Sequence, residues 1–179
     1  MPQWIGLLRG VNVGGRNKMP MAQLTERLES IGCTDVQTYI QSGNFVFGSR
    51  VKSRATLGRR IMVAIEDSFG FRPSCLLLSP TQFRSAIENN PFVEAVTAPK
   101  TLHFFFLDST PSNPDLDAIS KLATGAEEYR LIDDVFYLHA PEGIGRSKLA
   151  TAAEKKLGVS ATARNYNTVA ALSRLLSDG

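Results

Sequence analysis

The chain has 179 residues, 43% of them hydrophobic, and its 20 Lys and Arg against 17 Asp and Glu give a formal charge of +3. This length supports one domain or two small ones with a sizeable core. Two cysteines and two histidines are too few for a disulfide framework or a Cys/His zinc site, so we expect no metal, and no cofactor is indicated. The start of the chain lacks a basic leader, and no apolar run reaches the roughly 18 residues of a membrane span. We therefore expect a cytoplasmic protein with no membrane partner.

The charges are unevenly distributed along the chain. Residues 1–62 hold nine basic and three acidic side chains, residues 63–141 hold five and eleven, and residues 142–179 hold six and three. The basic ends therefore flank an acidic middle. This pattern is consistent with an anionic ligand near the ends, although solvated surface charge is the commoner explanation for it.

The first half of the chain alternates strand and helix patterns. An apolar run at 3–9 predicts a buried strand, and a stripe of apolar residues from Met21 to Ile31 predicts a helix that Pro20 starts and Gly32 ends. Ser42-Gly43 predicts a hairpin turn between strands at 36–41 and 44–47. A helix at about 53–69 and a strand at 74–78 complete the order β-α-β-β-α-β, which is a ferredoxin-like split βαβ unit.

The second half predicts another α+β arrangement. A capping-box pattern at Ser79-Pro80-Thr81-Gln82 starts a helix that Asn90-Pro91 ends. The remaining expected elements are a strand at 102–107, a helix from about 113, a hairpin of 129–132 with 135–138, and helices at 149–157 and 168–176. We expect a ferredoxin-like domain at 1–80 and a smaller, closely packed α+β domain at 81–179, with the boundary between 80 and 100. The second half would extend the first sheet or pack beside it.

The loop between the first strand and the first helix is the strongest candidate for a binding site. Glycine lets backbone N–H groups approach a ligand, and a helix N-terminus attracts anions. The candidate ligand-binding residues of this loop are Arg9, Asn12, Gly14, Gly15, Arg16 and Lys18. The side chains that a P-loop requires are replaced here, so we reject that interpretation. A tight turn with solvated charges is the simpler alternative.

Two later segments also combine basic residues with the start of a helix. Gly143–Leu149 contributes Arg146, Ser147 as an N-cap, and Lys148, whereas Thr162–Thr168 contributes Arg164 and Asn165, with Asn167 or Thr168 as the cap. Ser42 and Asn44 at the hairpin are further candidates, or they satisfy local backbone groups. Because that hairpin should lie at the opposite end of the sheet from the exit of the first strand, we expect one shared pocket only if the second half bridges them.

Several short motifs together resemble the bacterial family DUF1697, a domain of unknown function. The resemblance spans residues 4–176, and Tyr166 departs from the tryptophan expected in many members. It implies a cytoplasmic α+β protein with a ferredoxin-like subdomain and implies no activity or catalytic residues. The motifs that carry it are Arg9-Gly10-x-Asn12-Val13-Gly14-Gly15, Pro20-Met21-x-x-Leu24, Thr38-Tyr39-Ile40-Gln41-Ser42-Gly43-Asn44, Asn90-Pro91-Phe92, Ser147-Lys148-Leu149 and Thr162-x-Arg164-Asn165-Tyr166-Asn167-Thr168.

Three functions remain open. The first is binding of an anionic or phosphorylated small molecule by the basic loops, with or without catalysis. The second is binding of single-stranded RNA or DNA, for which the sheet lacks the usual aromatic pattern. The third is a non-catalytic scaffold in which these motifs only cap helices. His103 and His139 have no neighbouring triad partners and are expected to be structural, and the sequence leaves the oligomeric state open.

Overall fold

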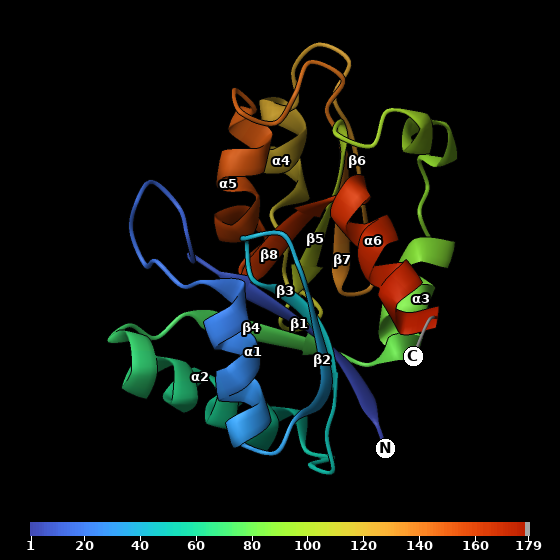
Figure 1. Ribbon diagram of the computed structural model, residues 1–179. Helices are drawn as coiled ribbons and strands as arrows, with labels where there is room; N and C mark the ends of the chain where they lie inside the picture. Colours follow the sequence, from blue (N-terminus) through green and yellow to red (C-terminus); the bar gives the residue numbers. More distant parts are fainter. Residues whose placement is uncertain (178–179) are drawn as a thin grey trace. The chain divides into compact units, whose positions relative to one another are not determined.

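The computed structural model describes residues 1–177, which form two compact units. One unit comprises residues 1–85 and the segment from Ala170 onward, and the other comprises residues 86–169. The protein is a mixed α+β protein with two four-stranded antiparallel sheets and six α-helices among the described residues (Figure 1).

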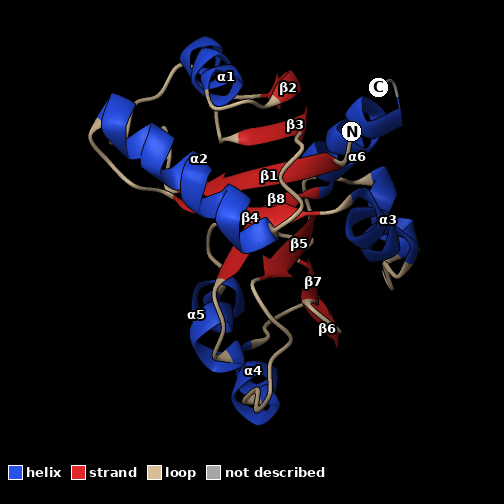
Figure 2. Ribbon diagram, turned by 90° about the horizontal axis from the view of Figure 1, so that it is seen from below, coloured by secondary structure: helices blue, strands red, loops and turns tan. Residues whose placement is uncertain are grey.

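The first unit has the predicted ferredoxin-like order. Its strands are arranged β2-β3-β1-β4, and each neighbouring pair is antiparallel. Helices α1 and α2 cover one face of this sheet (Figure 2). The elements in chain order are β1 (Gln3–Arg9), α1 (Met21–Ser30), β2 (Thr34–Tyr39), β3 (Asn44–Gly48), α2 (Arg54–Phe69), β4 (Ser74–Leu78) and α3 (Pro80–Glu88).

The second unit repeats this topology with its own sheet. Its strand order β6-β7-β5-β8 matches the order in the first sheet, since β5, β6, β7 and β8 take the places of β1, β2, β3 and β4. The second half therefore does not extend the first sheet, and its last strand was missing from the sequence-based expectation. The elements that follow α3 are η1 (Val93–Thr97), β5 (Leu102–Leu107), α4 (Leu116–Leu122), β6 (Glu128–Ile132), β7 (Val135–His139), α5 (Lys148–Leu157), β8 (Ala161–Asn165) and α6 (Tyr166–Ser177). Most of α6, from Ala170 onward, belongs to the first unit.

Local chemistry explains where the helices begin and end. Ser53 caps α2 by accepting a hydrogen bond from the Thr56 amide, and Gly70 ends the helix in the left-handed conformation. At the start of α3, the predicted capping box is present: the Ser79 amide donates to Gln82 Oε1 at 3.0 Å, and the Gln82 amide donates to Ser79 Oγ at 3.2 Å.

Each unit has an apolar core between its helices and its sheet. In the first unit, Trp4, Leu8 and Phe47 meet α1 and α2, whereas Ile5 and Leu7 are buried on the other face of β1. This two-sided burial explains the continuous apolar run in the first strand. The core of the second unit is formed in the same way by β5, β7, β8, α4 and α5.

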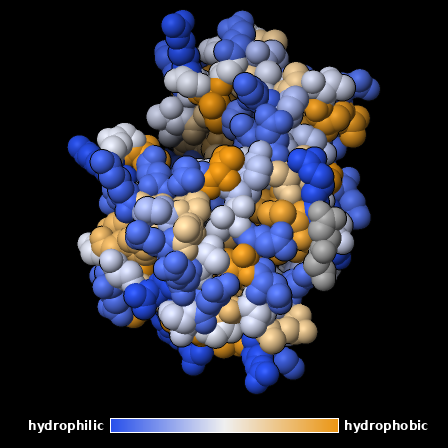
Figure 3. Space-filling model, viewed as in Figure 1, coloured by the Kyte–Doolittle hydropathy of each residue, from blue (hydrophilic) through white to orange (hydrophobic). Residues whose placement is uncertain are grey.

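The surface drawn in Figure 3 is mostly hydrophilic, with hydrophobic residues in small separate patches. The large hydrophobic side chains that are exposed belong to Met1, Val13, Ile40, Val63, Val93 and Leu116. Among residues 1–177, none of the helices has the length and apolar character needed to cross a membrane.

Candidate functional site

The glycine loop after β1 is a small hairpin that protrudes from the first unit (Figure 1). Val13 and Arg16 form a β-bridge, with the Arg16 amide donating to the Val13 carbonyl at 3.0 Å, and Gly14 and Gly15 between them both have positive φ. These angles are those of a two-residue hairpin turn. The glycines therefore shape a turn, and the side chains of Arg16 and Lys18 are exposed on it.

Asn12 ties this loop to the turn between β2 and β3. Its Nδ2 donates to the carbonyls of Met19 at 2.9 Å and Gln41 at 2.7 Å, while its Oδ1 accepts from the Met19 amide at 2.7 Å. All three contacts are hydrogen bonds to the protein backbone, so they stabilise the loop. They do not test the predicted ligand-binding role of Asn12. They use both ends of its amide group.

The expectation that the hairpin turn lies opposite the exit of β1 is wrong. Leu7 pairs with Asn44, and the Leu8 amide donates to the Gly43 carbonyl at 2.8 Å, so the turn lies beside the exit of β1. The reason is topological: β2 follows a β-α-β crossover and runs parallel to β1, so both strands end on one side of the sheet. The structure thus brings Arg9, the glycine loop and Ser42 to one end of the first unit.

Ser42 and Asn44 satisfy local groups within that turn. Asn44 is fully buried, and its Nδ2 donates to the Tyr39 carbonyl at 3.1 Å and to Ser42 Oγ at 3.0 Å. A buried amide needs such partners, because leaving it unsatisfied costs about 1–3 kcal/mol. These two residues hold the turn together, and their role toward a ligand stays a prediction.

The second basic segment lies at the start of α5. Ser147 is buried and caps the helix, since its Oγ accepts from the Ala150 amide at 3.0 Å. The amides of Lys148 and Leu149 lie in the first turn, where no acceptor exists within the helix. Lys148 itself is exposed, and Arg146 precedes the cap.

A cavity of about 490 Å³ opens beside this helix start. Its volume falls in the range of small-molecule sites, roughly 300–1,000 Å³. One part of its wall is the loop from Ala140 to Ser147, and the other is the turn between α4 and β6. Lining residues that can interact with a polar ligand are Thr124, Glu127, Glu142, Gly143, Arg146 and Ser147.

The two carboxylates of this cavity were not identified from the sequence. Glu127 Oε2 accepts from the Thr124 amide at 3.0 Å, so its position is fixed by the turn between α4 and β6. Glu142 lies next to Gly143 in the basic segment, yet an isolated glutamate in a loop carries no signal of its own. Only the tertiary structure brings both carboxylates to the wall that also contains Arg146.

The third basic segment differs from the expectation, because most of it is strand β8. Residues Ala161–Asn165 pair with β5, and Asn165 caps α6 by accepting from the Thr168 amide at 3.1 Å, in place of the predicted Asn167 or Thr168. Arg164 is largely buried, its Nη1 donates to the Ala163 carbonyl, and burial lowers its pKa to about 10.

Arg164 does not join the cavity at α5. Ala163 packs against the core under α4 and α5, and neighbouring residues of a strand point to opposite faces. Arg164 therefore lies on the other face of the sheet, beside its partner Phe104. Of the three basic segments, the first belongs to the first unit and the other two to the second, and Arg164 is separated from Arg146 by the second sheet.

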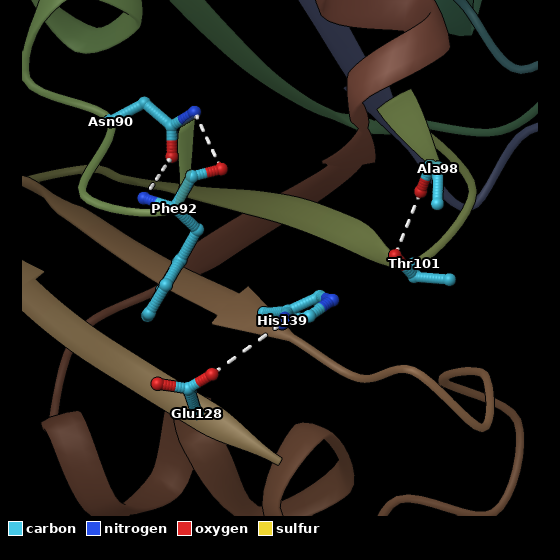
Figure 4. A network of polar contacts seen from close by, with 6 residues as sticks. All are labelled: Asn90, Phe92, Ala98, Thr101, Glu128 and His139. Atoms are coloured by element: carbon cyan, nitrogen blue, oxygen red, sulfur yellow. Dashed lines mark hydrogen bonds and ion pairs between the residues drawn. The ribbon is translucent and has the colours of Figure 1, made fainter. Parts of the chain in front are cut away.

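His139 belongs to a small polar group at the end of β7 (Figure 4). Its Nδ1 lies 3.8 Å from Glu128 Oε1, and its ring lies 6.0 Å from that of Phe92. Asn90 holds Phe92 in place by accepting from its amide at 3.0 Å. The family motif Asn90-Pro91-Phe92 thus forms a turn after α3 that packs on His139.

His103 is buried in β5, with 7% of its surface exposed. Its Nδ1 has no hydrogen-bond partner among the described residues, and burial lowers its pKa from 6.5. It pairs with Leu138 and Asn165 on the neighbouring strands. Residues 1–177 contain no group of three His, Cys, Asp or Glu side chains that could hold a metal ion.

Comparisons with known proteins identify a family but no activity. A family model described as "Protein of unknown function (DUF1697)" matches residues 1–137. A solved structure of a conserved bacterial protein from Streptococcus pneumoniae is similar, with 25% sequence identity, a TM-score of 0.67 and coverage of 98% of both chains. The search among curated proteins gave no match.

Proposed function

Since the chain belongs to the DUF1697 family, whose members are described only as proteins of unknown function, we propose a role from its own surface: it binds a small anionic molecule in the cavity beside α5. One observation carries this proposal. The Ser147-capped start of α5 and the Arg146 side chain line the same cavity. A helix start and a guanidinium both stabilise negative charge, and together they favour a phosphate or carboxylate group.

The carboxylates on the cavity wall narrow the class of ligand. The lining carries two negative side chains, Glu127 and Glu142, and one positive side chain, Arg146. A molecule with several negative groups would therefore be repelled. Both carboxylates can accept hydrogen bonds from hydroxyl or amino groups. The cavity therefore suits a molecule with one anionic group and several hydroxyl or amino groups, such as a sugar monophosphate or a hydroxy acid.

Nucleic-acid binding is the less supported alternative. A ferredoxin-like unit that binds RNA stacks bases on an exposed sheet face. In the first unit, Trp4 and Leu8 on one face of β1 and Ile5 and Leu7 on the other are all buried. A salt-dependent affinity for single strands would favour this alternative over the small ligand, and the scaffold hypothesis predicts no affinity for either.

Thermal-shift titrations with sulfate, inorganic phosphate, sugar phosphates, nucleotides and acyl phosphates test the proposal. At least one anion should raise the melting temperature, because a ligand that binds only the folded state stabilises it. The absence of any shift, including one with sulfate at high concentration, would contradict the proposal.

Variants at α5 distinguish binding in the cavity from a thermal shift caused by the overall charge of the protein. Ser147→Asp keeps a good N-cap but places a negative charge at the site, so it should abolish the shift while the fold is retained. Arg146→Gln should weaken it. Lys155→Gln removes one charge from the exposed surface of the last turn of the same helix and should leave the shift unchanged.

A further inference from the structure

A second cavity, of about 660 Å³, lies within the first unit. It is the space between the start of β1, the edge strand β2, the end of β3, and residues of α3 and α6. None of its lining residues belongs to the basic segments. The polar side chains that line it are Gln3, Asp35, Gln37 and Arg84.

Two oppositely charged side chains, those of Arg84 and Asp35, line this cavity. Arg84 and Asp35 form no ion pair within 4 Å, and neither side chain has another hydrogen bond or ion pair to residues 1–177. Both side chains can therefore interact with a bound molecule. Asp35 and Arg84 are both exposed, so water can solvate their charges when no molecule is bound.

The remaining lining gives further information about such a molecule. Gln3 and Gln37 each offer an amide that donates and accepts hydrogen bonds. Val46 and Leu175 add apolar surface. The cavity thus combines one cationic group, one anionic group, two neutral amides and an apolar wall.

We infer that this cavity binds a small zwitterion, an amino acid or dipeptide, with its carboxylate on Arg84 and its ammonium group on Asp35. A guanidinium can hold a carboxylate with two parallel hydrogen bonds, and a carboxylate accepts from an ammonium group. A purely anionic ligand would be repelled by Asp35, and a purely cationic ligand would be repelled by Arg84. The apolar wall favours amino acids with an aliphatic side chain. This cavity shares no lining residue with the proposed anion site beside α5, so an experiment can contradict one proposal without contradicting the other.

Calorimetric titrations with the standard amino acids and with dipeptides of aliphatic residues test the inference. We expect binding of at least one aliphatic member and about tenfold weaker binding of its N-acetyl and its carboxamide derivatives, each of which lacks one charge. Tenfold corresponds to about 1.4 kcal/mol. No binding by any of these zwitterions, or equal binding of the blocked derivatives, would overturn the inference.

Two variants, each of which removes one charge from the cavity, assign the contacts. Asp35 has φ of 52°, which asparagine also tolerates, so Asp35→Asn should keep the fold and lose the preference for the free ammonium group. Arg84→Gln should lose the preference for the free carboxylate. Arg60→Gln and Asp67→Asn remove the same charges from the exposed surface of α2 and should bind as the original protein does. Unchanged selectivity in both cavity variants would overturn the assignment.

Discussion

The ring of Phe45 lies directly over Gly6, its partner across the β1–β3 ladder. A Cβ atom at position 6 would overlap this ring, and Phe45 is fully buried. Glycine in a strand interior ordinarily weakens the strand, and here it makes room for an aromatic side chain of the core. The pair gives a sharp test of the packing between β1, β3 and the two helices.

Gly6→Ala should destabilise the protein by about 1–3 kcal/mol, because the added methyl forces the Phe45 ring from its place. Urea unfolding measures this change. Gly58→Ala in α2 is the matched control: its new methyl would approach only Leu77 Cδ1, at 3.9 Å, and alanine favours a helix, so stability should rise by up to about 1 kcal/mol. If Phe45→Leu does not reduce the cost of Gly6→Ala, the proposed overlap is not its cause.

Asn12→Asp should loosen the loop after β1 from the turn between β2 and β3. Aspartate keeps the acceptor for the Met19 amide and tolerates the φ of 53°, but it cannot donate to the carbonyls of Met19 and Gln41. We expect a loss of about 1–3 kcal/mol and faster hydrogen exchange at residues 12–19 and 40–43. Asn17→Asp removes a single exposed bond, to the Gly10 carbonyl, and should cost less. Equal protection in both variants would contradict the bridging role of Asn12.

His103 should make stability depend on pH. Burial lowers its pKa from 6.5, so the folded state binds fewer protons than the unfolded state as the pH falls below 6.5. The free energy of unfolding contributed by this group is therefore retained above pH 6.5 and lost below it, by at most about 1.4 kcal/mol per pH unit for one proton. Urea unfolding between pH 5 and 7.5 should give the His103→Gln variant a shallower slope of unfolding free energy against pH than the original protein has. An unchanged slope in His103→Gln would exclude His103 as its source.

Cys33 should react with thiol reagents far more slowly than Cys75. Burial raises the pKa of the Cys33 thiol to about 11, whereas Cys75 is only half-buried. Because the thiolate is the reactive form, a disulfide reagent at pH 8 should modify one thiol quickly in the folded protein and the second only after denaturation. The Cys75→Ser variant should lose the fast phase. A fast phase that survives this substitution would show that Cys33 is accessible.

Local sequence signals predicted most elements of the first unit. The helix expected at about 53–69 is α2, the Ser79–Gln82 capping box lies where the pattern placed it, and the ferredoxin-like order and the family are confirmed. These features depend on residues close together in the chain, which determine the hydrogen bonds at a helix end without help from distant segments.

Strand β8 shows where such signals stop. Ala161–Asn165 is short and ends in Arg and Asn, so its composition resembles a loop before a helix, and only pairing with β5, more than 50 residues earlier in the chain, makes it a strand. The ferredoxin-like order of the second unit depends on this strand. Because β8 was not predicted, the second ferredoxin-like order was not predicted either. The Ser42-Gly43 turn was correctly predicted from its composition. Its position was wrong, because the strand topology of the unit places it beside the exit of β1.

The sequence by itself determined which segments are helices, where the glycines permit sharp turns and where the positive charges are concentrated. The tertiary structure decided what those groups do: Asn12 and Asn44 are used in bonds to the backbone, Arg164 is on the opposite face from Arg146, and Glu127 and Glu142 share a cavity with Arg146. The physical reason is that capping and turn formation involve neighbours a few residues apart, whereas a cavity is assembled from strands and loops that pairing and core packing bring together.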